Sequence, residues 1–170
     1  MVSSSAFRNY RRLITDRIQQ DGLKVWIYGT ANPVHESNRQ LQAWALDSWA
    51  NGASGLVPWQ TINKSGSALH QADQLGLFIY DKTEEGKTIV HHSARLKAFR
   101  ESEQLVEYLL LVQEKQHWSA AQIAAFIEHY VSLSGVVRKK SDQDAGTAEY
   151  DREELVSIES LRQAAIEILR

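Results

Sequence analysis

The order of helical and extended patterns in the first half of the chain constrains the fold more than any other feature. Residues 6–20 carry apolar side chains at helical spacing, and Asp21-Gly22 ends that pattern. Residues 23–29 are rich in β-branched and aromatic side chains and predict a strand. A second helix is expected over residues 37–50 and a second strand over 55–59. Because parallel strands need a helical crossover, this alternation predicts β/α units around a parallel sheet.

Further along, two more extended pieces and a long helix are expected. Residues 77–80 and 88–90 flank a turn and predict short strands, and residues 93–118 show the longest run of helical spacing. We therefore assign residues 1–118 to one β/α segment.

Residues 119–170 are expected to form a helical tail. Ser119 and Gln122 resemble a capping box that opens a helix ending near Gly135. Residues 138–150 lack aliphatic stretches and predict a mobile loop, and Asp151 with Glu154 predicts the start of a last helix.

Composition narrows the classes of function. A chain of 170 residues with 43% hydrophobic residues fits a folded domain, and a formal net charge of −2 argues against a nucleic-acid partner. The absence of cysteine excludes disulfides, a thiol nucleophile and a thiolate metal site. No window approaches the roughly 20 apolar residues of a membrane span, and no signal peptide is recognisable. The compartment stays unassigned, with both a secreted and a cytoplasmic parent open.

Aromatic side chains cluster on the two clearest strands, at what we expect to be their C-terminal ends: Trp26, Tyr28 and Trp59. In β/α folds that edge holds the ligand site. Trp26 and Tyr28 are two residues apart and therefore point to the same side of their strand. Ring faces suit the C–H faces of sugars, while the Tyr hydroxyl and the Trp N–H bond to hydroxyls. A purely structural role for these rings in the core is the alternative.

Five segments carry a family resemblance through their order and spacing: Gly22–Gly29, Trp49–Trp59, Gly76–Tyr80, Ser93–Arg100 and Glu107–Leu109. With them the chain resembles, over roughly residues 10–112, the C-terminal part of glycoside hydrolase family 123-like (β/α)8 barrels. That group includes β-N-acetylgalactosaminidases. The helix of the family usually carries Gly and Asp where this chain has Ser102 and Leu105.

The resemblance implies a partial TIM-type barrel, namely its last β/α units followed by the helical tail, since a whole barrel takes about 250 residues. It also implies that catalysis depends on adjacent Asp and Glu residues on an earlier strand, with Glu as the general acid. No Asp-Glu dipeptide occurs in this chain. We therefore expect no catalytic residue, no cofactor and an inactive isolated chain, although the parent would be a hydrolase.

The expected contribution is substrate binding, with an N-acetylhexosamine-containing glycan as the partner. Besides the three rings above, the candidate binding residues are Tyr80, His35 and Asn63. Asn63 also begins a glycosylation acceptor sequence that we attribute to chance. His91 and His92 are neighbours that point to opposite faces of a strand, so no metal site is expected.

Two other functions remain open. The chain could be a non-catalytic carbohydrate-binding remnant, or a helical protein-interaction domain in which the aromatic rings are core. A barrel fragment exposes unpaired strand edges, which favours self-association or pairing with a missing N-terminal barrel portion. We also expect the last helix to cover the strand face if no oligomer does so.

Overall fold

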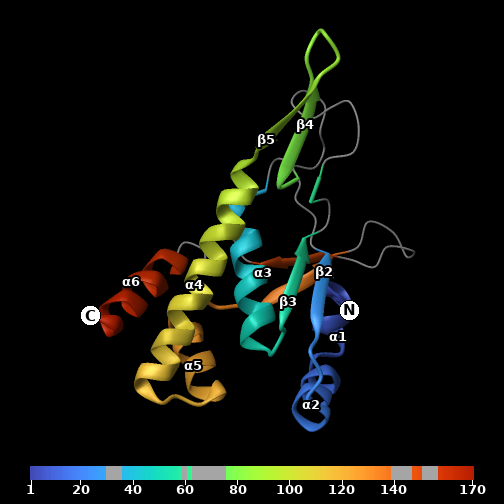
Figure 1. The fold of residues 1–170 in the computed structure, drawn as a ribbon. Helices are drawn as coiled ribbons and strands as arrows, with labels where there is room; N and C mark the ends of the chain where they lie inside the picture. Colours follow the sequence, from blue (N-terminus) through green and yellow to red (C-terminus); the bar gives the residue numbers. More distant parts are fainter. Residues whose placement is uncertain (30–35, 59–60, 63–75, 139–146, 151–156) are drawn as a thin grey trace.

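A computed structural model describes residues 1–29, 36–58, 61–62, 76–138, 147–150 and 157–170. The chain is a mixed α/β protein in which helices predominate and the strands form small sheets. Within the described residues, the largest sheet has three parallel strands in the order β1-β2-β3 (Figure 1). These strands are β1 (Val2–Ser3), β2 (Trp26–Gly29) and β3 (Gly55–Pro58). The predicted parallel sheet and the predicted α/β class are confirmed.

Helices make the crossovers between these strands: α1 (Ser4–Asn9) and α2 (Arg11–Asp21) join β1 to β2, and α3 (Asn38–Ala50) joins β2 to β3. The single helix expected over residues 6–20 is two helices that meet at Tyr10. Gly22 ends α2 with a φ of 64°, a left-handed conformation that favours glycine. Ser37 caps α3 by accepting a hydrogen bond from the Arg39 amide.

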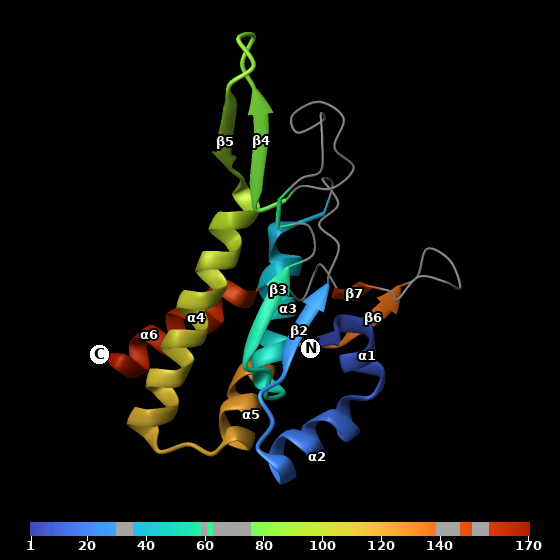
Figure 2. The same ribbon diagram turned by 45° about the vertical axis from the view of Figure 1, so that its right-hand side comes forward.

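A β-hairpin follows the sheet, formed by β4 (Phe78–Lys82) and β5 (Thr88–His92). Phe78 forms a parallel bridge to Ile62, and the hairpin extends beyond the C-terminal ends of β2 and β3 (Figure 2). Helix α4 (Ala94–Gln116) then runs back along α3.

The C-terminal region is less helical than expected. Helix α5 (Ala120–Tyr130) begins with the predicted capping box of Ser119 and Gln122. It is followed by an antiparallel pair, β6 (Gly135–Arg138) and β7 (Thr147–Tyr150). The predicted loop over residues 138–150 is therefore wrong at Arg138 and at residues 147–150, which form backbone pairs in β6 and β7, while residues 139–146 lie outside the described part.

The last helix, α6 (Ile158–Leu169), packs mainly on α4 and also on α5. Its buried residues Ile158, Leu161 and Ala165 belong to the same core as Leu105 and Leu109 of α4. This helix therefore does not cover the strand face, because its apolar stripe packs against a matching stripe on α4, and of the two expected ways of covering that face only association with another chain stays a prediction. The expected start at Asp151 lies outside the described residues.

Candidate functional site

The two faces of the parallel sheet differ in how far they are covered. Ile27, in the middle of β2, is 0% exposed, whereas its neighbour Trp26 is 50% exposed. Trp26 pairs with Gly55 and Tyr28 pairs with Val57, so these side chains share the face opposite to Ile27. Both ribbon views place α3 and α4 on one side of β2 and β3 (Figures 1 and 2).

Trp26 lies against the backbone of Gly55. A Cβ atom added at Gly55 would come within 2.8 Å of Cε2 of Trp26, so only glycine leaves room for the ring. Trp26 and Gly55 are the first residues of β2 and β3. Trp26 therefore shares a face with Tyr28, as predicted, but it lies at the N-terminal end of the sheet instead of the expected C-terminal end. Its role as a substrate contact stays a prediction.

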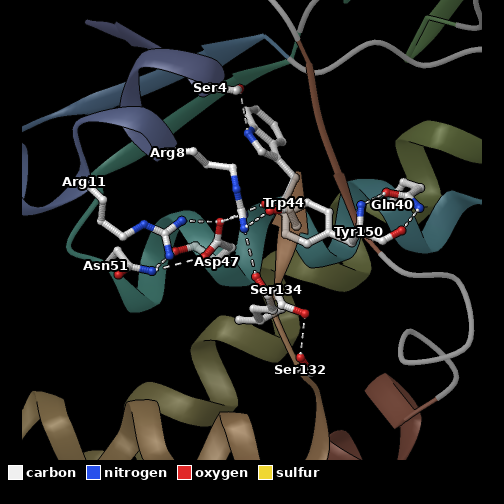
Figure 3. Close-up of polar contacts among 12 residues, drawn as sticks. Ser4, Arg8, Arg11, Gln40, Trp44, Asp47, Asn51, Ser132, Ser134 and Tyr150 are labelled. Atoms are coloured by element: carbon white, nitrogen blue, oxygen red, sulfur yellow. Dashed lines mark hydrogen bonds and ion pairs between the residues drawn. The ribbon is translucent and has the colours of Figure 1, made fainter. Parts of the chain in front are cut away.

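The C-terminal end of β2 is fixed beside the start of α1. Ser4 Oγ donates to the Tyr28 carbonyl oxygen at 3.0 Å. It also accepts from Nε1 of Trp44 at 2.9 Å (Figure 3). Gly29 has a φ of 117°, and a Cβ there would lie 3.1 Å from Ser4 Oγ. The half-buried side chain of Tyr28 is therefore held at the edge where β/α folds bind ligands.

Tyr80 belongs to the hairpin and not to the parallel sheet; it is half-buried and pairs with Val90. In the same hairpin His92 contacts Phe78 edge-to-face, with ring centroids 5.7 Å apart, while His91 pairs with Ile79. The described residues contain no group of three or more His, Cys, Asp or Glu side chains that could hold a metal ion. The predicted site residues Trp59, His35 and Asn63 lie outside the described residues.

Arg95, within the segment Ser93–Arg100, is a buried cation near the start of α4. Its Nη2 donates to the Glu36 carbonyl oxygen at 2.7 Å. Burial lowers the pKa of Arg95, and the negative charge of Glu36 opposes that shift. A buried arginine in the first turn of a helix is unusual, because the positive end of the helix dipole disfavours it.

Ser93, the N-cap residue of α4, makes further contacts beside Arg95. Its Oγ accepts from the amides of Arg95 at 3.1 Å and Leu96 at 3.3 Å, and donates to the Gly76 carbonyl at 2.6 Å. The start of α4 is therefore tied both to the segment before α3 and to the segment before β4. We interpret Ser93 and Arg95 as residues that position the C-terminal side of the sheet.

A second polar cluster, centred on the buried Asp47 of α3, lies on the helical side of the molecule (Figure 3). Asp47 Oδ2 accepts from Arg8 Nη1 and Arg11 Nη2, both at 2.7 Å, and from the Tyr150 hydroxyl at 2.9 Å. Asn51 Nδ2 donates to Oδ1 at 3.2 Å. Burial, followed by the charge of Asp47, raises the pKa of Tyr150 well above its ordinary value.

This Asp47 cluster joins the C-terminal hairpin to α1 and α3. Arg8 also donates to the Gly135 carbonyl at 2.7 Å. The Gln40 side chain exchanges two hydrogen bonds with the Tyr150 backbone, at 2.7 and 2.9 Å. Nothing in the sequence pattern brings residues 8, 47 and 150 together. Because the carboxylate already accepts from four side-chain donors, we interpret the cluster as structural.

Comparisons with protein-family models, with curated proteins and with solved structures found no match for the chain. Among the described helices, none combines the length and the apolar character needed to cross a membrane.

Proposed function

We propose that the chain forms the last β/α units of a glycoside hydrolase family 123-like barrel and contributes aromatic side chains to a carbohydrate site. The observation that carries this proposal is the exposed, aromatic face of a parallel sheet whose strands follow in sequential order. Open α/β sheets carry helices on both faces, whereas successive barrel units keep their helices outside and their inward face for the interior. The arrangement of β1, β2 and β3 fits an arc of such a barrel.

On this proposal, Tyr28 contacts the sugar most directly. It stands at the C-terminal end of β2, where its phenol can bond to a hydroxyl while its ring covers a C–H face. Trp26 lies about two residue rises lower on the same face, or roughly 6–7 Å along the strand. Trp26 therefore forms the floor of the site, and Tyr80, Trp59, His35 and Asn63 remain candidate contacts.

The described carboxylates give no support for independent catalysis. Asp47, the buried one, is engaged by Arg8 and Arg11 and lies among the helices, away from the exposed sheet face. Glycosidases of this kind need two positioned carboxyl groups that can exchange protons with the substrate. The proposed role is therefore binding, with the acid and base supplied by other strands of a complete barrel.

Calorimetric titration tests the binding role. We expect N-acetylgalactosamine or N-acetylglucosamine to bind with a dissociation constant of about a millimolar, typical of a small ligand with few contacts. Tyr28→Ala should abolish this binding. Tyr10→Ala, which removes an exposed ring on the helical side, is the matched control and should not change it. Equal affinity in both variants contradicts the proposal.

A hydrolysis assay tests the other half of the proposal. The isolated chain should release no product from aryl N-acetylgalactosaminides or N-acetylglucosaminides. Turnover that survives purification and changes with a mutation in this chain would show that the chain carries its own catalytic groups.

A protein-interaction role is the second candidate, supported by exposed apolar side chains on the helices. Leu110 and Leu111 of α4 are both about half exposed, as is Leu23 after α2. A stable oligomer that binds none of the sugars tested would favour this role over carbohydrate binding.

A further inference from the structure

An apolar groove lies beside the edge of the sheet, between the end of α3, the start of β3 and one side of α4. It encloses about 500 Å³ and is lined by Trp49, Leu56, Phe99 and Val106, with Glu103 and Glu107 also at its wall. Within the described residues β3 pairs only with β2, so its other edge presents unpaired backbone groups next to this groove. Such edges pair readily with another strand.

The chain itself shows what fits beside a β/α unit of this kind. Strand β2 pairs with β3 in parallel, and helix α3 packs along α4. Repeating the same relation once more, beyond β3, places a parallel strand on its free edge and a helix over the groove of α4. A strand followed by a helix therefore fits this edge and groove.

At the opposite edge of the sheet, β1 and the helices that follow it form a strand-helix unit with an exposed surface. Strand β1 pairs only with β2 among the described strands, and α2, the second of the two helices that follow β1, has no buried residue. On α2, Leu13 is 62% exposed and the Arg12 side chain 95% exposed, and Tyr10 beside them is also exposed. This surface offers apolar groups and the Arg12 cation, whose Nε lies 3.9 Å from Oδ2 of Asp16 on the same helix, whereas the groove offers apolar groups and two carboxylates.

We propose that copies of this chain associate head to tail, with β1 and α2 of one copy seated on the β3 edge and the α4 groove of the next. Leu13 enters the groove near Val106, and Arg12 faces Glu103 and Glu107. A symmetric contact of the groove with itself is disfavoured, because it would bring those two glutamates against their own copies. The interface is thus heterologous, using different surfaces on the two copies.

This proposal rests on the barrel-like arrangement of the proposed function, with a second copy in the place of the neighbouring barrel strands. It does not depend on the sugar. Loss of sugar binding therefore leaves the association intact, and a monomeric chain that still binds sugar overturns the association alone.

Single cysteines give a direct test, because the chain has no cysteine of its own. Full-length Arg12→Cys and Glu103→Cys variants are mixed and oxidised. We expect disulfide-linked dimers in the mixture and none from either variant alone. Glu84→Cys, at the exposed tip of the β4–β5 hairpin, is mixed with Glu103→Cys as the control for random collision. Linkage of Glu103→Cys to itself, or equal linkage to the Glu84→Cys control, overturns the proposal.

Sedimentation of unmodified and substituted chains supplies the second readout. Leu13→Asp should raise the dissociation constant at least about tenfold, because it places a charge where apolar area is buried. Arg12→Glu should weaken association about fivefold at low salt, and adding Glu103→Arg should restore it. Circular dichroism verifies that these exposed substitutions keep the helices. A chain that stays monomeric at high concentration overturns the proposal.

Discussion

Two neighbouring residues of β2 point to opposite faces of the sheet and have different environments. Ile27 is fully buried under the helices, in one core with Phe7 and Trp44, while Trp26 is half exposed on the other face. The covered side also holds the Asp47 cluster, in which Arg8, Arg11 and the Tyr150 hydroxyl donate to one carboxylate oxygen. The covered face is therefore where the fold obtains its stability, and the exposed face is available for a ligand or another chain.

Removing the central charge of the covered side should have the largest effect. Asp47→Ala leaves Arg8, Arg11 and the Tyr150 hydroxyl without their shared acceptor, and should cost about 3–5 kcal/mol in free energy of unfolding. Urea denaturation measures it. Asp16→Ala, which removes only the exposed i,i+4 pair with Arg12, is the control and should change stability by at most about 0.5 kcal/mol. Similar losses of stability in both variants would show that the Asp47 cluster is not what joins the β6–β7 hairpin to the helices.

Alanine substitutions at the two neighbouring positions of β2 compare the faces directly. Ile27→Ala should cost about 2–5 kcal/mol, since it opens a cavity in a closely packed core. Trp26→Ala should cost only about 1 kcal/mol, although it removes the larger side chain, because half of that side chain is already in solvent. The same denaturation curves give both values. A greater loss for Trp26 would mean that the exposed face is a core surface.

The pH dependence of stability gives a smaller effect. The pKa of Tyr150 is raised in the folded state, chiefly by burial, so the folded chain keeps its phenolic proton where the unfolded chain has begun to lose it. The stabilisation is complete below the unfolded pKa, about 10, and is lost as pH rises toward the folded value.

Comparing the unmodified chain with Tyr150→Phe between about pH 8 and pH 11 isolates this contribution. The unmodified chain should lose stability more steeply above about pH 10. Parallel curves for the two chains would indicate that the Tyr150 hydroxyl is accessible to solvent.

Much of the local structure follows from sequence periodicity. Ser119 and Gln122 predict the start of α5 because a capping box depends only on residues three apart, and the structure contains it. The alternation around β2 predicts a shared face for Trp26 and Tyr28, and the structure confirms it. The parallel sheet follows from the order of the elements, because a short loop cannot join parallel strands.

Long-range pairing could not be predicted in the same way. Strand β7 pairs with β6, and its Tyr150 also contacts Gln40 and Asp47, more than 100 residues away. Local composition at Thr147–Tyr150 does not predict these distant contacts. Trp26 lies at the N-terminal end of β2 and not at the C-terminal end that the strand pattern predicts. The register of β2 against Gly55 of β3 sets where the strand begins, and the strand pattern does not contain that register. The hydrogen bond from Arg95 to the Glu36 carbonyl could not be predicted either, because the two residues are 59 positions apart in the sequence.

The central claim is that the exposed face of the sheet is the ligand-binding face, and nuclear magnetic resonance on a labelled chain tests it most directly. Titration with N-acetylgalactosamine should shift the Tyr28 amide and the Trp26 indole N–H in a saturable way. The Ile27 side-chain methyl groups and the Arg8 guanidinium on the covered side should stay in place. Shifts confined to the covered side, or none at ligand concentrations of about tens of millimolar, would contradict the account, because weak sugar sites saturate in that range.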